Sequence, residues 1–137
     1  MVKQLDHIGI AVENLDESIS KWCSLFDLKL RGKEEIKSRK LEVAMLDLEG
    51  GPTIELIASA GTGSTIDEFI QKRGEGIHHF CFEVQNVEAA IKTLAEQGIK
   101  LVSEEPQKGA EGSLIAFIHP SSFNGVLIEL KQKSKKN

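Results

Sequence analysis

Four residues of the types that bind divalent metal ions occupy matching places in the two halves of the chain. His7 and His79 each begin an apolar segment, and Glu55 and Glu129 each stand inside the sequence Ile-Glu-Leu. Imidazole nitrogens and carboxylate oxygens together suit Zn²⁺, Co²⁺, Ni²⁺ or Mn²⁺, with coordination positions left for water or substrate. If these four side chains converge, the chain holds one catalytic metal site.

The neighbours of these residues favour a buried site. His7 shares one face of its predicted strand with Gly9 and Ala11, because alternate residues of a strand point to the same side. Such small side chains leave room for a ligand. Burying an unpaired carboxylate such as Glu55 or Glu129 among apolar neighbours is costly, and a metal ion would offset that cost.

The matching places belong to an internal repeat. The segment HIGIAVENLDESISKW, from His7, resembles HFCFEVQNVEAAIKTL, which starts 72 positions later at His79. The two Ile-Glu-Leu motifs are 74 positions apart. A repeat of this kind predicts two half-domains related by a pseudo-twofold axis. The first and last strands of each half then lie at the centre, and the four metal-binding side chains face one cavity.

Each copy is predicted to contain a strand, a helix and three further strands. In the first copy these are 5–12, the helix 15–26 capped by Asn14, then 28–36, 41–48 and 53–58. In the second copy they are 77–84, the helix 87–94 closed by Gly98, then strands near 100–103, 114–119 and 126–130. A short helix over 64–73 joins the copies. The predicted fold is α+β, with two tandem βαβββ modules forming a curved mixed sheet around a metal-binding cavity.

Length and composition limit the class of protein. The chain has 137 residues, of which 40% are hydrophobic and 28% charged, as in one ordinary globular domain. We expect this domain to cover 1–131, with repeats at about 5–60 and 77–131. The Lys-rich tail 132–137 is expected to extend into solvent.

Charge and cysteine content limit the expected binding partners and the expected cellular compartment. The net charge of −4, with no basic face, argues against nucleic acid as a partner. No apolar run is long enough to span a bilayer, and MVKQLDH does not look like a signal peptide, so we expect no membrane partner and no export. Cys23 and Cys81 form no CxxC motif, and a reducing cytoplasm fits them best.

Three segments, LDHIGIAV, GIHHFCFEVQNVEAAI and FIHPSSFNGVLIEL, resemble the vicinal oxygen chelate superfamily, and within it the methylmalonyl-CoA epimerases. The resemblance covers the whole chain except the tail. It implies one divalent ion, with Co²⁺ expected first, held by His7, His79 and Glu129. Glu55 stands at a position that is Gln in some members and Glu in others. His79, and not the adjacent His78, matches the ligand position, which leaves His78 as a structural neighbour.

The resemblance also implies an activity. A metal-dependent isomerase of this family interconverts (2R)- and (2S)-methylmalonyl-CoA, an acyl-CoA thioester, by removing the C2 proton to form an enolate. Inversion needs an acid and a base on opposite sides of C2. The resemblance implies that Glu42, in the third predicted strand, and Glu129 fill these roles. Judged from its own surroundings, beside Arg39 and Lys40, Glu42 is equally compatible with a solvent-exposed strand position.

Two other functions remain open at this point. A glyoxalase I also uses two His and two Glu around a metal, and it isomerises a glutathione hemithioacetal; Glu55 in place of Gln favours it slightly. A binding protein of the bleomycin-resistance type keeps the scaffold without a metal, but four intact ligand positions argue against it. In any of these proteins, exposed edge strands favour a homodimer.

Overall fold

The computed structural model describes residues 1–135, which form two compact units. One unit contains residues 7–78, and the other contains residues 1–6 together with residues 79–135. Both units combine helices with β-strands, which confirms the predicted α+β class. The boundary falls inside the first strand, β1 (Val2–Ala11), between Asp6 and His7.

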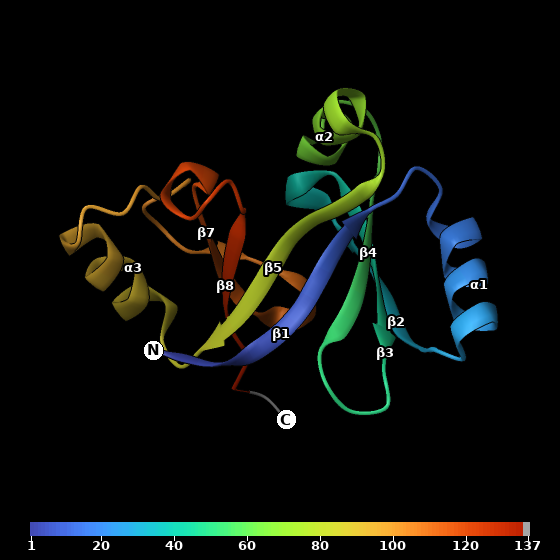
Figure 1. Cartoon of the computed structure of the whole chain (residues 1–137), viewed down its shortest axis with the longest axis horizontal. Coiled ribbons are helices and arrows are strands. Elements are labelled where there is room, and N and C mark those ends of the chain that lie inside the picture. The colour runs from blue at the N-terminus through green and yellow to red at the C-terminus, as the bar shows by residue number, and fades with distance from the viewer. Residues whose placement is uncertain (136–137) are drawn as a thin grey trace. The chain divides into compact units, whose positions relative to one another are not determined.

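The unit of residues 7–78 contains the predicted βαβββ order. After β1 come α1 (Leu15–Phe26), β2 (Lys29–Ile36), β3 (Leu41–Asp47) and β4 (Thr53–Ser59), followed by α2 (Thr65–Arg73). From His7 onward, β1 pairs with β4 in parallel. Strand β3 pairs with both β4 and β2 in antiparallel fashion (Figure 1). One turn of 3₁₀ helix, Lys37–Arg39, joins β2 to β3.

Helix α1 covers one face of this sheet. It begins after Asn14, whose side-chain oxygen accepts a hydrogen bond from the backbone N–H of Glu17 at 2.9 Å, as predicted. Its apolar side packs on residues that point to one face of β1, β3 and β4, such as Ile10, Ala44 and Leu56. Residues of the opposite parity, which include His7, point to the other face of the sheet.

The other unit repeats the arrangement with a shorter third element. It contains β5 (Gly76–Val84, from His79 onward), α3 (Val87–Glu96), β6 (Gln107–Lys108), β7 (Leu114–Ile118) and β8 (Ile128–Gln132). Single 3₁₀ turns lie at Ala110–Gly112 and Pro120–Ser122. Strand β5 pairs with β8 in parallel, and β7 pairs with β8 and β6 in antiparallel fashion. Helix α3 packs on one face of this sheet, against residues such as Ala116 and Leu130 (Figure 1).

The predicted strand near 100–103 is wrong. The chain makes one isolated bridge there, between Leu101 and Ile118, and then leaves the sheet. The hydroxyl of Ser103 bonds to the backbone of Glu105 instead, and Pro106 has no N–H to donate to a neighbouring strand. Pairing with β7 resumes only in the two residues of β6.

The Lys-rich end of the chain also differs from expectation. Strand β8 continues to Gln132, whose side-chain oxygen accepts a hydrogen bond from the backbone N–H of Val87 at 2.9 Å. Lys133 makes an ion pair with Glu83 at 3.3 Å. These two residues of the predicted tail are therefore held to the unit, whereas Lys136 and Asn137 lie outside the described residues. Across residues 1–135, none of the helices combines the length and the apolar character needed to cross a bilayer.

Candidate metal centre and active site

The unit of residues 7–78 brings its predicted His and Glu together. The Nε2 atom of His7, on β1, lies 3.6 Å from Oε1 of Glu55, on β4, and both residues are buried. The parallel register sets Gly9 directly beside Glu55. Because glycine has no side chain, the carboxylate has room to reach towards His7. That Gly9 and Ala11 leave room for a ligand beside His7 stays a prediction.

The other unit contains an equivalent pair. The Nε2 atom of His79, on β5, lies 2.8 Å from Oε1 of Glu129, on β8, and both residues are again buried. Phe117 of β7 is the register partner of Glu129. Its ring meets the imidazole of His79 edge-on, at 5.9 Å between centroids and an interplanar angle of 88°. Three strands therefore fix the direction of this imidazole.

Within each pair, the chemistry and the spacing of the two donor atoms suit binding to a metal ion. Ligand atoms about 2.0–2.2 Å from one ion stand about 3 Å apart at right angles and about 3.4 Å apart at the tetrahedral angle. The measured separations of 2.8 Å and 3.6 Å fall close to these values. Neutral imidazole and ionised carboxylate are the donors that a borderline divalent ion prefers. Each unit therefore supplies two donors suited to a metal.

The chain resembles known proteins over nearly all of its length. Residues 6–117 match the model of the glyoxalase/bleomycin resistance protein/dioxygenase superfamily. The mitochondrial methylmalonyl-CoA epimerase of Dictyostelium discoideum is 34% identical over 133 residues, which are 96% of this chain and 80% of the relative. The chain belongs to the methylmalonyl-CoA epimerase family. This confirms the resemblance inferred from the sequence motifs.

Solved epimerase structures agree with this assignment. The crystal structure of the methylmalonyl-CoA epimerase from Mycobacterium tuberculosis matches with a TM-score of 0.95 and 36% identity, over 98% of this chain and 91% of that one. A methylmalonyl-CoA epimerase in complex with methylmalonyl-CoA and NH4+ matches with a TM-score of 0.92 and 28% identity, over 98% and 97% of the two chains. The α+β fold of this chain is therefore the epimerase fold.

Glu42, which the resemblance to the epimerases suggested as a catalytic residue, does not share the face of His7 and Glu55. Paired residues of adjacent strands point to the same face, and Glu42 pairs with Ala58, a core residue beneath α1. A hydrogen bond and an ion pair with Asp16 of α1 raise the pKa of Lys33, and the charge of Glu42 adds to the rise. Glu42 therefore lies on the α1 side of this sheet, and its catalytic role stays a prediction.

Another carboxylate of the same hairpin does lie on the face of Glu55. Glu34 of β2 pairs with Val43 of β3, which in turn pairs with Ile57 of β4. Ile57 is two residues after Glu55 on β4, so Glu34, Val43 and Ile57 all point to the same face of the sheet as Glu55. Glu34 is half-buried there. The sequence prediction missed this residue. The sequence carried one signal: Glu34 is two residues before the apolar Ile36, so both point to the same face of the strand. Which face of the sheet this is follows only from the pairing of β2 with β3.

The second histidine of the His78-His79 pair is the one that faces Glu129. His78 instead places its ring edge-on against Phe69 of α2, at 4.9 Å between centroids. Its predicted role as a structural neighbour is confirmed. His119 accepts a hydrogen bond at Nδ1 from the backbone N–H of Ser121 at 3.0 Å, within a local turn.

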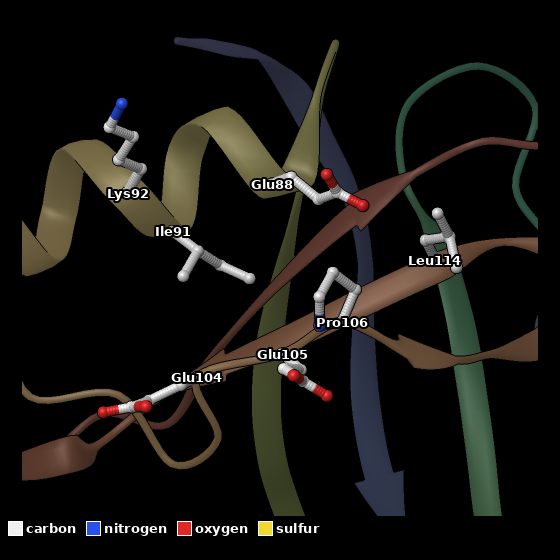
Figure 2. Close-up of a pocket in the computed structure, with 7 residues that line it drawn as sticks. All are labelled: Glu88, Ile91, Lys92, Glu104, Glu105, Pro106 and Leu114. Carbon is white, nitrogen blue, oxygen red and sulfur yellow. The ribbon is translucent and has the colours of Figure 1, made fainter.

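A cavity of about 580 Å³ lies elsewhere in the same unit as His79 and Glu129. Figure 2 shows it between α3 and the segment around Pro106, with three carboxylates at its edge. Ile91 and Leu114 in its lining also belong to the core beneath α3. The cavity thus opens on the helix-covered side of the sheet, whereas Glu129 points to the other side. It is not part of the candidate site.

A buried ionic cluster lies on the same face of β5 and β8 as His79 and Glu129. Glu83 accepts a hydrogen bond from Gln4 at 2.7 Å and pairs with Lys3 at 3.4 Å and Lys133 at 3.3 Å. Burial alone would raise the pKa of Glu83, but Gln4, Lys133 and Lys3 together hold the pKa of this carboxyl below its ordinary value. The folded protein therefore favours the ionised form of Glu83.

This shift predicts a contribution of Glu83 to acid stability. A carboxyl whose pKa is lower in the folded state stabilises the fold fully above its unfolded pKa, and that stability is lost as pH falls through the folded pKa. We expect Glu83→Gln to flatten the decline in the free energy of unfolding below about pH 5. Urea denaturation at a series of pH values measures the free energy of unfolding of each protein. Glu96→Gln, at the exposed end of α3, is the control; equal slopes for all three proteins would contradict the prediction.

Proposed function

We propose that the chain is a methylmalonyl-CoA epimerase that interconverts the (2R) and (2S) thioesters through proton transfer at C2. The observation that carries this proposal is the 34% identity to a named epimerase over almost the whole chain. The two buried His–Glu pairs support it, because they are the donors such a site needs. A solved relative in complex with methylmalonyl-CoA supports an acyl-CoA thioester as substrate.

We further propose that the two units act as one domain, residues 1–131, and that their pairs hold one ion. The four ligands would be His7, Glu55, His79 and Glu129. The support is the equivalence of the pairs: each joins the first and last strands of its own unit, and in each unit those two strands pair in parallel. When bound, the ion supplies Lewis-acid stabilisation of the negative charge that develops on the thioester oxygen.

Proton transfer is the work of the chain's carboxylates. One carboxylate accepts the C2 proton while the C–H electron pair moves towards the thioester oxygen, and a carboxylic acid on the opposite side returns a proton to C2. We propose Glu129 for one role. For the other we propose Glu42, as the resemblance to the epimerases implies, or Glu34, which lies on the face of Glu55. Asp47 also has the parity of Glu55, but its carboxylate makes an ion pair with Arg31 and a hydrogen bond with Thr53 at the strand end.

The test is exchange at C2. Incubated with the metal-loaded protein in heavy water, methylmalonyl-CoA is expected to take up deuterium at C2 and to reach an equal mixture of enantiomers, as followed by NMR. Metal analysis of protein purified without chelator is expected to show one ion per chain. Absence of exchange, combined with turnover of a glutathione hemithioacetal, would favour a glyoxalase instead. Protein with no stoichiometric ion that binds a small drug would favour a sequestering protein.

Three further properties can be proposed for this enzyme: its metal, its cellular compartment and its oligomeric state. We propose Co²⁺ as the metal, since imidazole and carboxylate donors suit it, with Zn²⁺, Ni²⁺ and Mn²⁺ as alternatives for the metal analysis to separate. Cys23 and Cys81, which form no CxxC motif, fit the reducing cytoplasm. Exposed apolar side chains, Leu25 and Phe26 at the end of α1 and Leu30 on β2, support a homodimer, which light scattering would detect.

A further inference from the structure

A buried ion pair lies beside the proposed metal ligands in the sequence. The Nζ atom of Lys131, on β8, is 3.1 Å from Oδ2 of Asp6, on β1. The two side chains are only 8% and 11% exposed. A buried lysine is costly unless a carboxylate meets it, so this contact fixes both partners in one arrangement.

Both partners of this ion pair are close in sequence to proposed metal ligands. Asp6 immediately precedes His7, and Lys131 follows Glu129 by two residues on the same face of β8. The ion pair thus joins the residue before one proposed ligand to the neighbour of another. Because the two residues are adjacent in the chain, a movement of the Asp6 backbone also moves the backbone of His7.

Further contacts hold the same stretch of β1. Lys133 approaches Asp6 at 3.7 Å and Glu83 at 3.3 Å, while Lys3 and Gln4 bond to Glu83. Residues 3–6 are therefore attached to β5 and to the end of β8. Of these contacts, only those of Asp6 act at the residue next to His7, and Lys131 is its buried partner.

We infer that the Asp6–Lys131 ion pair is a positioning device that fixes His7 for metal binding. The inference rests on the proposed metal site and assigns roles to two residues outside the four proposed ligands. The pair holds the backbone at Asp6, so the imidazole of His7 is presented in place before the ion arrives. Ligands that are held in place in this way bind a metal more tightly than ligands that must first be ordered.

Charge alone predicts the opposite result for one variant. Lys131 is a cation close to a site for a divalent cation, so its removal would strengthen metal binding if it acted only through its field. Loss of a positioning contact would weaken metal binding. Removing Asp6 weakens binding under either explanation. The sign of the change in Lys131→Met therefore separates positioning from simple electrostatics.

The experiment titrates the metal-free full chain with Co²⁺ alone and follows the visible spectrum of the bound ion. We expect Lys131→Met and Asp6→Asn each to weaken Co²⁺ binding by about tenfold or more, the cost typical of losing support behind a ligand. The double variant should lose little more than either single variant, since the pair acts as a unit. Lys131→Arg should restore most of the affinity.

Lys3→Met serves as the matched control. It removes the same charge from the same cluster but contacts Glu83 and not Asp6, so it should bind Co²⁺ like the wild type. Circular dichroism checks that every variant is folded, and the double variant, which leaves no unpaired buried charge, covers the case in which Lys131→Met unfolds. Wild-type-like or tighter binding in Lys131→Met, or in the double variant, would overturn the inference alone. A wild-type chain that binds no Co²⁺ would overturn the proposed metal site as well.

Discussion

Replacing His79 with alanine is expected to remove the bound metal and to lower epimerisation by about 10³-fold. The substitution takes away one donor of a buried pair whose atoms are 2.8 Å apart, and it leaves Glu129 without its imidazole partner. A Lewis acid supplies several kcal/mol of transition-state stabilisation, and each 1.4 kcal/mol corresponds to about a factor of ten in rate. Metal content by elemental analysis and kcat/KM for methylmalonyl-CoA measure the two losses.

His78→Ala is the matched control for this variant. It removes the same kind of ring from the adjacent residue, but that ring packs edge-on against Phe69 of α2. We expect full metal content and near-normal turnover, with a small loss of stability of about 1 kcal/mol from the aromatic contact. If His78→Ala lost the metal and His79→Ala kept it, the assignment of the ligand would have to be exchanged.

The second large effect is expected at β2. Glu34→Gln should lower epimerisation by about 10²-fold or more while the metal stays bound, because an amide cannot accept or return the C2 proton. Removal of one of two acid–base groups also separates exchange from inversion. The enantiomer whose proton faces Glu129 should still exchange C2 hydrogen with heavy water, whereas conversion to the other enantiomer is lost.

Glu42→Gln is the control that the sheet itself provides. Glu42 lies one strand away in the same hairpin, but it points to the face covered by α1. If Glu34 is the second acid–base group, replacement of Glu42 leaves both exchange and inversion close to wild type. An inactive Glu42→Gln beside an active Glu34→Gln would restore the role first inferred for Glu42 and remove Glu34 from the mechanism.

Local sequence determined the order of elements and the His–Glu pairs. The helix cap at Asn14 and the apolar spacing of α1 are short-range signals, and the structure places that helix at the predicted residues. The repeat predicted that each half supplies one histidine from its first strand and one glutamate from its last. Parallel pairing of the first and last strands in each unit follows from that repeat, and it is found in both units.

The side to which Glu42 points was decided only by the tertiary structure. The segment LEVAML is apolar at almost every position, because β3 is covered on both faces, so its pattern carries no alternation to read. A shift of one residue in register moves every side chain to the opposite face. Only the pairing of Glu42 with Ala58 places it under α1.

The burial and ion pairing of Lys131 could likewise not be predicted from the sequence. A run of lysines at a chain end predicts a solvated tail, and nothing near Lys131 in the sequence suggests a carboxylate partner. Asp6 is 125 positions away, and the two meet because residues 1–6 belong to the same unit as β8. Local pattern sets which elements form, whereas contacts between distant segments decide which charges are buried and paired.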